Sequence, residues 1–123
     1  MKFTRETPAT LTIHSVSDHE IRIGDAVYRN PIALTIDAVS DDWPAKVLAD
    51  LVADDFSRLL NDNPEIIVLG TGKEIQFPPR ELVFAMARRG VGFEVMDTRA
   101  AARTFNVLAG EDRRVAAVLY IGI

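Results

Sequence analysis

One stretch of the sequence, residues 66–96, constrains the fold more than any other. Residues 66–69 are a continuous apolar run that ends at Gly70, which is typical of a strand buried on both faces of a sheet. Residues 78–90 predict a helix, because prolines suit a first helical turn and arginines followed by glycine suit a last one. Residues 91–96 predict the next strand. This order joins parallel strands through a right-handed crossover, so we predict an α/β fold.

The first third of the sequence is predicted to form β-structure. Apolar and polar residues alternate over much of residues 10–36, and Gly24-Asp25 is typical of a tight hairpin turn. The polar residues 1–10 are expected to form a flexible arm. The cluster at residues 40–42 resembles a helix N-cap and precedes Trp43, which either packs in the core, the alternative we favour, or anchors a partner on the surface.

Two more helices and a final strand complete the prediction. Phe56, Leu59 and Leu60 have helical spacing within residues 53–60, and a second helix is expected over residues 97–108, ended by Gly110. Residues 115–121 predict the last apolar strand. The sequence contains neither an internal repeat nor a linker, so we expect residues 1–123 to form a single domain.

Composition excludes several classes of function. The chain has 14 Lys and Arg residues against 18 Asp and Glu residues, a net charge of −4, whereas nucleic-acid binding depends on a basic excess. The absence of cysteine excludes disulfides and thiol chemistry. No apolar run approaches the roughly 18 residues of a membrane span. We therefore expect a cytoplasmic protein that neither binds nucleic acid nor inserts into a membrane.

Catalytic and metal-binding motifs are also missing from the sequence. His14 and His19 are the only histidines, and neither has a second ligand at metal-binding spacing. The serines lack the Gly-x-Ser-x-Gly setting of a nucleophile elbow. We therefore expect no metal and no cofactor, and we favour a protein that is not an enzyme.

The parallel strands nevertheless predict a candidate binding site. The loops that leave their C-terminal ends, Gly70-Thr71-Gly72 and Asp97-Thr98, should lie along one edge of the sheet, where open α/β sheets usually bind ligands. The glycine loop lacks the spacing of a phosphate loop, and Ile75 takes the place of the third glycine of a dinucleotide loop. Its amides either cradle an anion or only form a tight turn.

Glu94 and polar residues of the following helix are also expected near this edge. Glu94 interrupts an apolar strand, so it is either buried and paired in a central strand or exposed on an edge strand, the alternative we favour. Asp97 or Thr98 is expected to cap the next helix. On that helix Arg103 and Asn106 share a face. Arg103 either binds an anion or forms a structural ion pair with Glu94 or Asp97.

Three segments in combination resemble a known family. Residues 64–72, 90–98 and 101–108 are similar to the small Mth938-like domain family of bacteria and archaea, whose mitochondrial relatives include complex I assembly factor 3. The resemblance implies a three-layer α/β fold, in which a central mixed sheet has helices on both faces and an extra N-terminal β element. It implies no reaction. The mitochondrial members act by associating with other proteins during complex I assembly.

Two hypotheses about function follow. The first is a non-catalytic protein-binding or assembly-factor-like module, whose partner is another protein or a second copy of the chain. The second is a site for a small anionic ligand, or an enzymatic site, at the C-terminal ends of the strands. The candidate ligand-binding residues of the second hypothesis are Gly70, Thr71, Gly72, Glu94, Asp97, Thr98, Arg103 and Asn106.

Overall fold

The computed structural model describes residues 11–44 and 46–122, so the arm expected over residues 1–10 lies outside the described part. The strands of this part are β1 (Ile13–Val16), β2 (Ile21–Ile23), β3 (Ala26–Tyr28), β4 (Ile32–Leu34), β5 (Val39–Ser40), β6 (Ile66–Thr71), β7 (Gly92–Met96) and β8 (Val115–Tyr120). The helices are η1 (Leu48–Asp50), η2 (Ala53–Phe56), α1 (Ser57–Leu60), α2 (Arg80–Arg88) and α3 (Thr98–Gly110), of which η1 and η2 are 3₁₀-helices.

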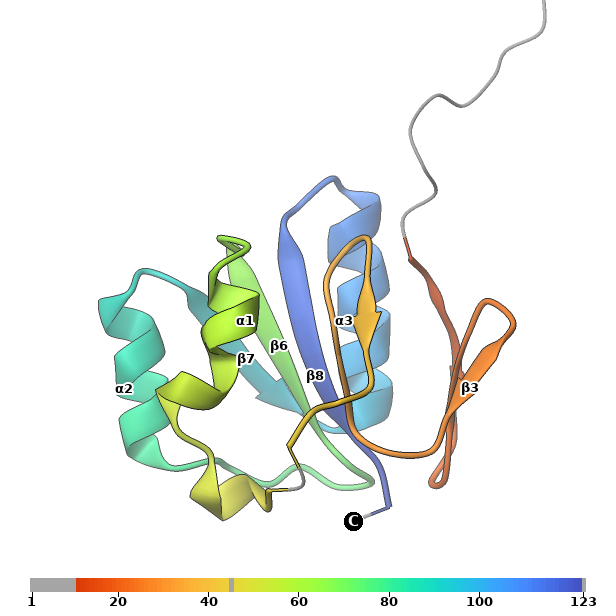
Figure 1. Ribbon diagram of the computed structural model, residues 1–123, viewed down its shortest axis with the longest axis horizontal. Helices are drawn as coiled ribbons and strands as arrows, with labels where there is room; N and C mark the ends of the chain where they lie inside the picture. The colour runs from red at the N-terminus through yellow and green to blue at the C-terminus, as the bar shows by residue number, and fades with distance from the viewer. Residues whose placement is uncertain (1–10, 45, 123) are drawn as a thin grey trace, which may run out of the picture.

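Five of the strands form one mixed sheet in the order β5-β4-β8-β6-β7 (Figure 1). Strand β6 is parallel to β7 and to β8, whereas β4 is antiparallel to β8 and to β5. The register places Val68 of β6 between Glu94 of β7 and Ala117 of β8. Helix α2 connects β6 to β7, which confirms the predicted crossover between parallel strands.

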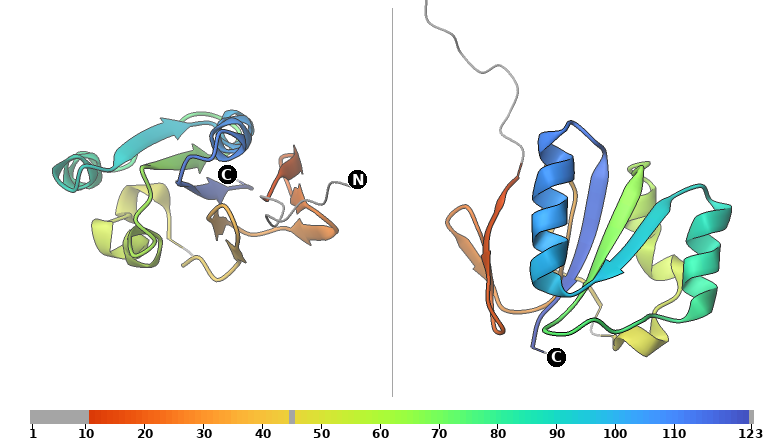
Figure 2. Two further views of the ribbon diagram at one scale, coloured as in Figure 1. Left: turned by 90° about the horizontal axis from the view of Figure 1, so that it is seen from above. Right: turned by 180° about the vertical axis from the view of Figure 1, so that it is seen from behind.

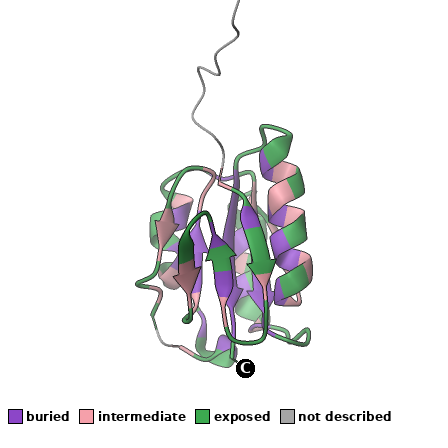
Figure 3. Cartoon of the chain, turned by 90° about the vertical axis from the view of Figure 1, so that its right-hand side faces the viewer, coloured by how far each residue is buried: buried purple, intermediate pink, exposed green. Residues whose placement is uncertain are grey.

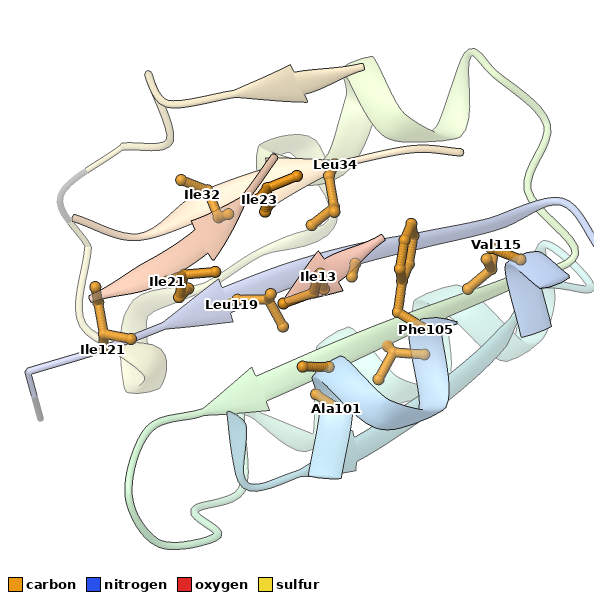
Figure 4. Packing of buried hydrophobic residues seen from close by; sticks show 14 residues of the cluster. Ile13, Ile21, Ile23, Ile32, Leu34, Ala101, Phe105, Val115, Leu119 and Ile121 are labelled. Atoms are coloured by element: carbon orange, nitrogen blue, oxygen red, sulfur yellow. The ribbon is translucent and has the colours of Figure 1, made fainter. Parts of the chain in front are cut away.

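The main sheet is covered on both faces (Figure 2). One face packs against α3 and against the small sheet β1-β2-β3, where Phe105 and Ala101 of α3 meet Leu119 of β8 and Ile21 of β2 (Figure 4). The other face packs against α2, α1 and the 3₁₀-helices. Side chains alternate between the faces, so Val68 belongs to the first cluster and its neighbour Ile67 to the second. This arrangement confirms the three layers and the extra N-terminal β element.

Phe56 lies at the centre of the second face. It is fully buried, and its ring makes edge-to-face contacts with Trp43 at 5.2 Å and with Phe93 at 5.8 Å between centroids. Such aromatic pairs stabilise a core by about 0.5–1.5 kcal/mol beyond the area that they bury. Trp43 therefore packs against the core, the alternative favoured from the sequence.

The small sheet is an antiparallel meander that begins at the N-terminal end of the described chain. Its hairpin turns at Gly24, whose φ of +59° is the left-handed conformation that glycine adopts at little cost. Ile21 and Ile23 of β2 belong to the core, and Arg22 between them is exposed, so buried and exposed residues alternate along the strand. Both buried and exposed residues are seen on the side of the molecule that Figure 3 shows. The predicted hairpin is therefore confirmed.

Several boundaries differ from the predictions. The strand expected over residues 32–36 ends at Leu34, because the Thr35 amide turns to donate to the carbonyl of Ala38 at 2.9 Å. The expected helix at residues 53–60 is a 3₁₀-helix followed by one α-helical turn. Helix α3 continues through Gly110, and Asp112 adopts the left-handed conformation with φ of 61° instead.

The cluster at residues 40–42 does not cap a helix. Ser40 belongs to β5, and the next helical turn starts only at Leu48. Asp42 instead pairs with Arg58, 3.0 Å away, and accepts a short hydrogen bond from Ser40. These hydrogen bonds lower the pKa of Asp42, that of Ser40 having the larger effect.

Candidate functional site

The C-terminal ends of β6, β7 and β8 meet at one edge of the main sheet, where the sequence places the candidate site. Thr98, at the start of α3, joins them: its hydroxyl accepts a hydrogen bond from the Gly72 amide at 2.7 Å and donates one to the Tyr120 carbonyl at 2.6 Å. The Thr98 amide donates to the Gly72 carbonyl at 2.9 Å. Thr98 is only 2% exposed. We call Gly72, Thr98 and Tyr120 the strand-end junction.

Thr71 shapes the loop that follows β6. Its buried hydroxyl lies 2.8 Å from the Glu74 carbonyl and 3.3 Å from the Met96 carbonyl, and it accepts a hydrogen bond from the Gln76 amide at 3.0 Å. The loop is therefore held by its own hydrogen bonds. Gly72, with φ of +101°, makes the turn that the sequence analysis gave as the alternative to an anion cradle.

Gly70 allows α3 to pack closely on β6. A Cβ atom at this position would lie 2.9 Å from the Thr98 hydroxyl oxygen and 3.0 Å from both the Ala101 methyl group and a Leu119 methyl group. The absence of a side chain at Gly70 therefore allows α3 to pack closely against β6. A ligand is not needed to explain it.

Asp97 has a structural role, and the space at this edge is small. Its carboxylate accepts a hydrogen bond from the Ala100 amide at 2.9 Å, which is the N-cap predicted for α3. The cavity bordered by Gly72, Lys73, Thr98 and Arg99 measures about 10 Å³, the space of a single water molecule. The C-terminal ends of the strands thus bring five of the predicted residues together, Gly70, Thr71, Gly72, Asp97 and Thr98, but leave little room for a ligand.

Glu94 lies apart from this junction. It is exposed on β7, one of the two edge strands of the main sheet, as favoured from the sequence. Within the described part of the chain, Glu94 forms no ion pair with Arg103 or with any other residue. A charge on an edge strand discourages the addition of another strand.

Asn106 connects α3 to the small sheet. Its side-chain amide nitrogen donates to the Ile13 carbonyl, and its side-chain oxygen accepts from the Ile13 amide, both at 2.9 Å. Asn106 therefore pairs with β1 as a residue of a neighbouring strand would. One N–H and the oxygen of its side chain are engaged by this pair of bonds. The contact could not be predicted from sequence pattern, because the two residues are far apart along the chain.

Arg103 faces a groove between β1 and α3 and not the strand-end junction. The groove measures about 350 Å³, and its walls include His14 and Ser15 of β1 and Arg99 of α3. Arg99 lies 3.7 Å from Asp18, which is also 3.9 Å from Lys73. Arg103 is exposed and has no ion-pair partner among residues 11–44 and 46–122. We call this the β1–α3 groove.

Several exposed apolar side chains belong to α2 and to the segment just before it, a feature that was not predicted from the sequence. Phe77 is 75% exposed and Phe84 51% exposed, and Ile75 and Val83 are partly exposed as well. Phe84 lies two residues from both Leu82 and Met86, the buried residues of α2, and so points away from the core. This spacing is the signal that could have revealed it. We call Ile75, Phe77, Val83 and Phe84 the α2 surface.

A second polar cluster lies on the far side of the sheet. The Tyr120 hydroxyl accepts a hydrogen bond from the Trp43 indole at 3.0 Å and donates one to the Lys46 carbonyl at 2.9 Å. Burial raises the pKa of the Tyr120 phenol. Lys46 in turn pairs with Asp55 at 2.8 Å. A pocket of about 280 Å³ lies beside Trp43, but Asp55 and Arg58, two of its charged residues, are already paired within the protein.

Two further properties concern the described residues as a whole. They contain no cluster of three or more His, Cys, Asp or Glu side chains placed to hold a metal ion. Nor do they include a helix with the length and apolar character to cross a membrane.

The layers described above define a small α/β domain of the Mth938-like type. The solved structure of a Bordetella pertussis protein described as a Mth938-like domain matches this chain with a TM-score of 0.78 and 28% identity, covering 99% of this chain and 93% of that one. A family described as "Protein of unknown function (DUF498/DUF598)" matches residues 13–120. The chain belongs to this family.

Two curated relatives are similar to the chain. A Francisella tularensis protein named "13 kDa major membrane protein" is 29% identical over 101 residues, which are 80% of each chain. The Homo sapiens protein named "NADH dehydrogenase [ubiquinone] 1 alpha subcomplex assembly factor 3" is 33% identical over 117 residues. That match covers 94% of this chain but only 63% of the human protein. The chain is therefore homologous to a complex I assembly factor.

Proposed function

We propose that this chain is a non-catalytic, assembly-factor-like module that binds another protein through the α2 surface. The observation that carries the proposal is the exposure of Phe77 and Phe84 to solvent, 75% and 51% respectively. Burying a large aromatic side chain in an interface is more favourable than leaving it in water. Aromatic residues are accordingly enriched in protein interfaces, where a few residues dominate the binding energy.

The surroundings of these side chains indicate the chemistry of the partner. Arg80 lies one helical turn before Phe84 and is exposed, and it forms no ion pair within the described residues. Arginine is, with tyrosine and tryptophan, a frequent contributor to binding energy. The partner is therefore a different protein with an apolar contact face that carries a carboxylate opposite Arg80. A second copy of this chain is the alternative occupant.

The relatives support this proposal by their names alone. Several are named as assembly factors, and an assembly factor acts through protein partners. The human protein is longer than the region matched here, so its complete role is part of the proposal. The cytoplasmic location stays a prediction, since a relative is named as a membrane protein. The predictions of no nucleic-acid binding and of no cofactor also stay predictions.

A site-specific photo-crosslinker tests the proposal. The crosslinking amino acid is placed at position 84 and, as a matched control, at Val107, an exposed apolar residue of α3 on the opposite face of the sheet. After irradiation in the source cells, we expect a discrete crosslinked protein from position 84 and none from position 107. Crosslinks to the same proteins from both positions would contradict a specific surface.

The captured protein is then purified, and its affinity for the chain is measured. We expect Phe77→Ser with Phe84→Ser to weaken binding by about 30-fold or more, the effect of losing residues that dominate an interface. Val107→Ser should leave the affinity unchanged. If the only captured protein is a second copy of this chain, and sedimentation shows a dimer that Phe84→Ser disrupts, the proposal of a different protein as the partner is wrong. Unchanged affinity in the double variant would reject the α2 surface.

A further inference from the structure

The β1–α3 groove lies between two elements that are hydrogen-bonded to each other. Its two walls come from elements that are distant in the sequence, and the paired hydrogen bonds between Asn106 and Ile13 hold them together. Ala102, which is 5% exposed, belongs to the core cluster beneath. The volume of about 350 Å³ lies within the range of small-molecule sites.

The charge of the groove is opposite to that of the whole protein. Its charged lining residues are Arg99 and Arg103, and no carboxylate lines it, although the chain has 18 acidic residues against 14 Lys and Arg. Asp18 is the carboxylate paired with Arg99, at 3.7 Å, and it is shared with Lys73. Arg103 forms no ion pair within residues 11–44 and 46–122. Within the described part of the chain, the guanidinium of Arg103 is therefore not paired with a carboxylate.

The spacing of the arginines suits one anion. Residues four apart on a helix have Cβ atoms about 5–6 Å from each other, so Arg99 and Arg103 can both reach a single group between them. Each guanidinium presents a planar fork of donors that matches the oxygens of phosphate or carboxylate. Across the groove, His14 and the Ser15 hydroxyl add donors from β1.

We infer that the β1–α3 groove binds a small oxyanion with two or more negative charges, a phosphate or a polycarboxylate, through Arg99 and Arg103. The site differs from the one predicted from the sequence, because it lies along the side of α3 and not at the C-terminal ends of the strands. Of the predicted ligand-binding residues it includes only Arg103 and Asn106, and Asn106 positions the wall instead of contacting the anion. No reaction is part of the inference.

Titration of the purified chain with pyrophosphate and with citrate tests the inference, with sodium chloride at matched ionic strength as the control. Binding is followed by calorimetry and by the NMR signals of the α3 amides. We expect saturable binding of at least one of the two anions and no saturation with chloride. If pyrophosphate binds more tightly than citrate, the groove is a phosphate site, and if citrate binds more tightly, it is a polycarboxylate site. Shifts confined to residues outside the groove would overturn the inference.

Matched variants locate the binding. We expect Arg103→Ala to weaken anion binding about fivefold or more and Arg99→Ala with Arg103→Ala to abolish it, because charge-assisted hydrogen bonds are lost. Arg88→Ala removes an exposed arginine from α2, on the other face of the sheet, and should leave the affinity for the anion unchanged. No saturable binding by the unmodified chain, or equal binding by the double variant, would reject the site. The Phe77→Ser, Phe84→Ser variant should still bind the anion, so this test is independent of the α2 surface.

Discussion

The side chain of Asn106 makes two hydrogen bonds, each of 2.9 Å, to the backbone of Ile13, from which it is separated by 93 positions in the sequence. The Asn106 side chain on α3 thus bonds to the backbone of β1 in the way that the backbone of a neighbouring strand would. The small sheet and the helix therefore form one unit on the first face of the main sheet, and the β1–α3 groove depends on the same contact.

Asn106→Ala should destabilise the chain by about 1–3 kcal/mol, because the Ile13 amide and carbonyl lose their partner in a partly buried place. Urea denaturation followed by circular dichroism measures the change. Hydrogen exchange of the β1 amides should accelerate more than that of β6. Asn30→Ala, at an exposed position, is the control and should have little effect. Equal stability of both variants would show that the amide pair does not hold the small sheet.

Thr98→Val should destabilise the chain by about 1–3 kcal/mol at nearly constant volume. The Gly72 amide and the Tyr120 carbonyl would both lose the buried hydroxyl that joins them. Thr98→Ser keeps the hydroxyl and should recover most of the stability. Thermal and urea unfolding of the two variants provide the comparison, and a serine variant as unstable as the valine variant would assign the effect to packing.

Two glycine substitutions should have opposite effects. Gly70→Ala places a methyl group 2.9 Å from the Thr98 hydroxyl oxygen and 3.0 Å from the Ala101 methyl group, so it should cost about 1–3 kcal/mol. Gly110→Ala meets no atom within 4 Å and lies in the last turn of α3, where alanine should be neutral or stabilise by up to about 1 kcal/mol. Unfolding midpoints in urea test both, and a tolerated Gly70→Ala would show that α3 can move away from β6.

Asp55 should make stability depend on pH in the acid range. Burial opposes its charge, but hydrogen bonds from Lys46 at 2.8 Å and from the Val52 amide at 2.9 Å outweigh burial and hold the pKa of Asp55 below its ordinary 3.8. The stabilisation is thus present above the ordinary pKa and is lost as pH falls through the lowered one. Asp55→Asn should flatten the fall in stability between about pH 5 and pH 2. An unchanged pH profile would assign the acid sensitivity to other carboxylates.

Much of the fold could be predicted because its signals are local. The apolar run at residues 66–69 and the helix that follows predicted a parallel crossover, and Gly24 marked the hairpin. Boundaries were less certain, since Thr35 and Asp112 adopt conformations set by a single hydrogen bond or by the end of a helix. The candidate site was predicted only in part. The order of the elements predicts that the strand ends lie close together. It does not predict how much space the side chains leave between them for a ligand.

By itself, the sequence determined an α/β fold with a parallel pair of strands and the exclusion of thiol chemistry, because each depends on composition or on short-range periodicity. Only the tertiary structure decided that the Thr98 hydroxyl closes the strand ends, that Arg103 faces β1, and that Phe77 and Phe84 stay in solvent. These outcomes depend on how α2, α3 and the small sheet pack on the main sheet. The same local pattern is compatible with several packings, and the contacts between distant residues select one.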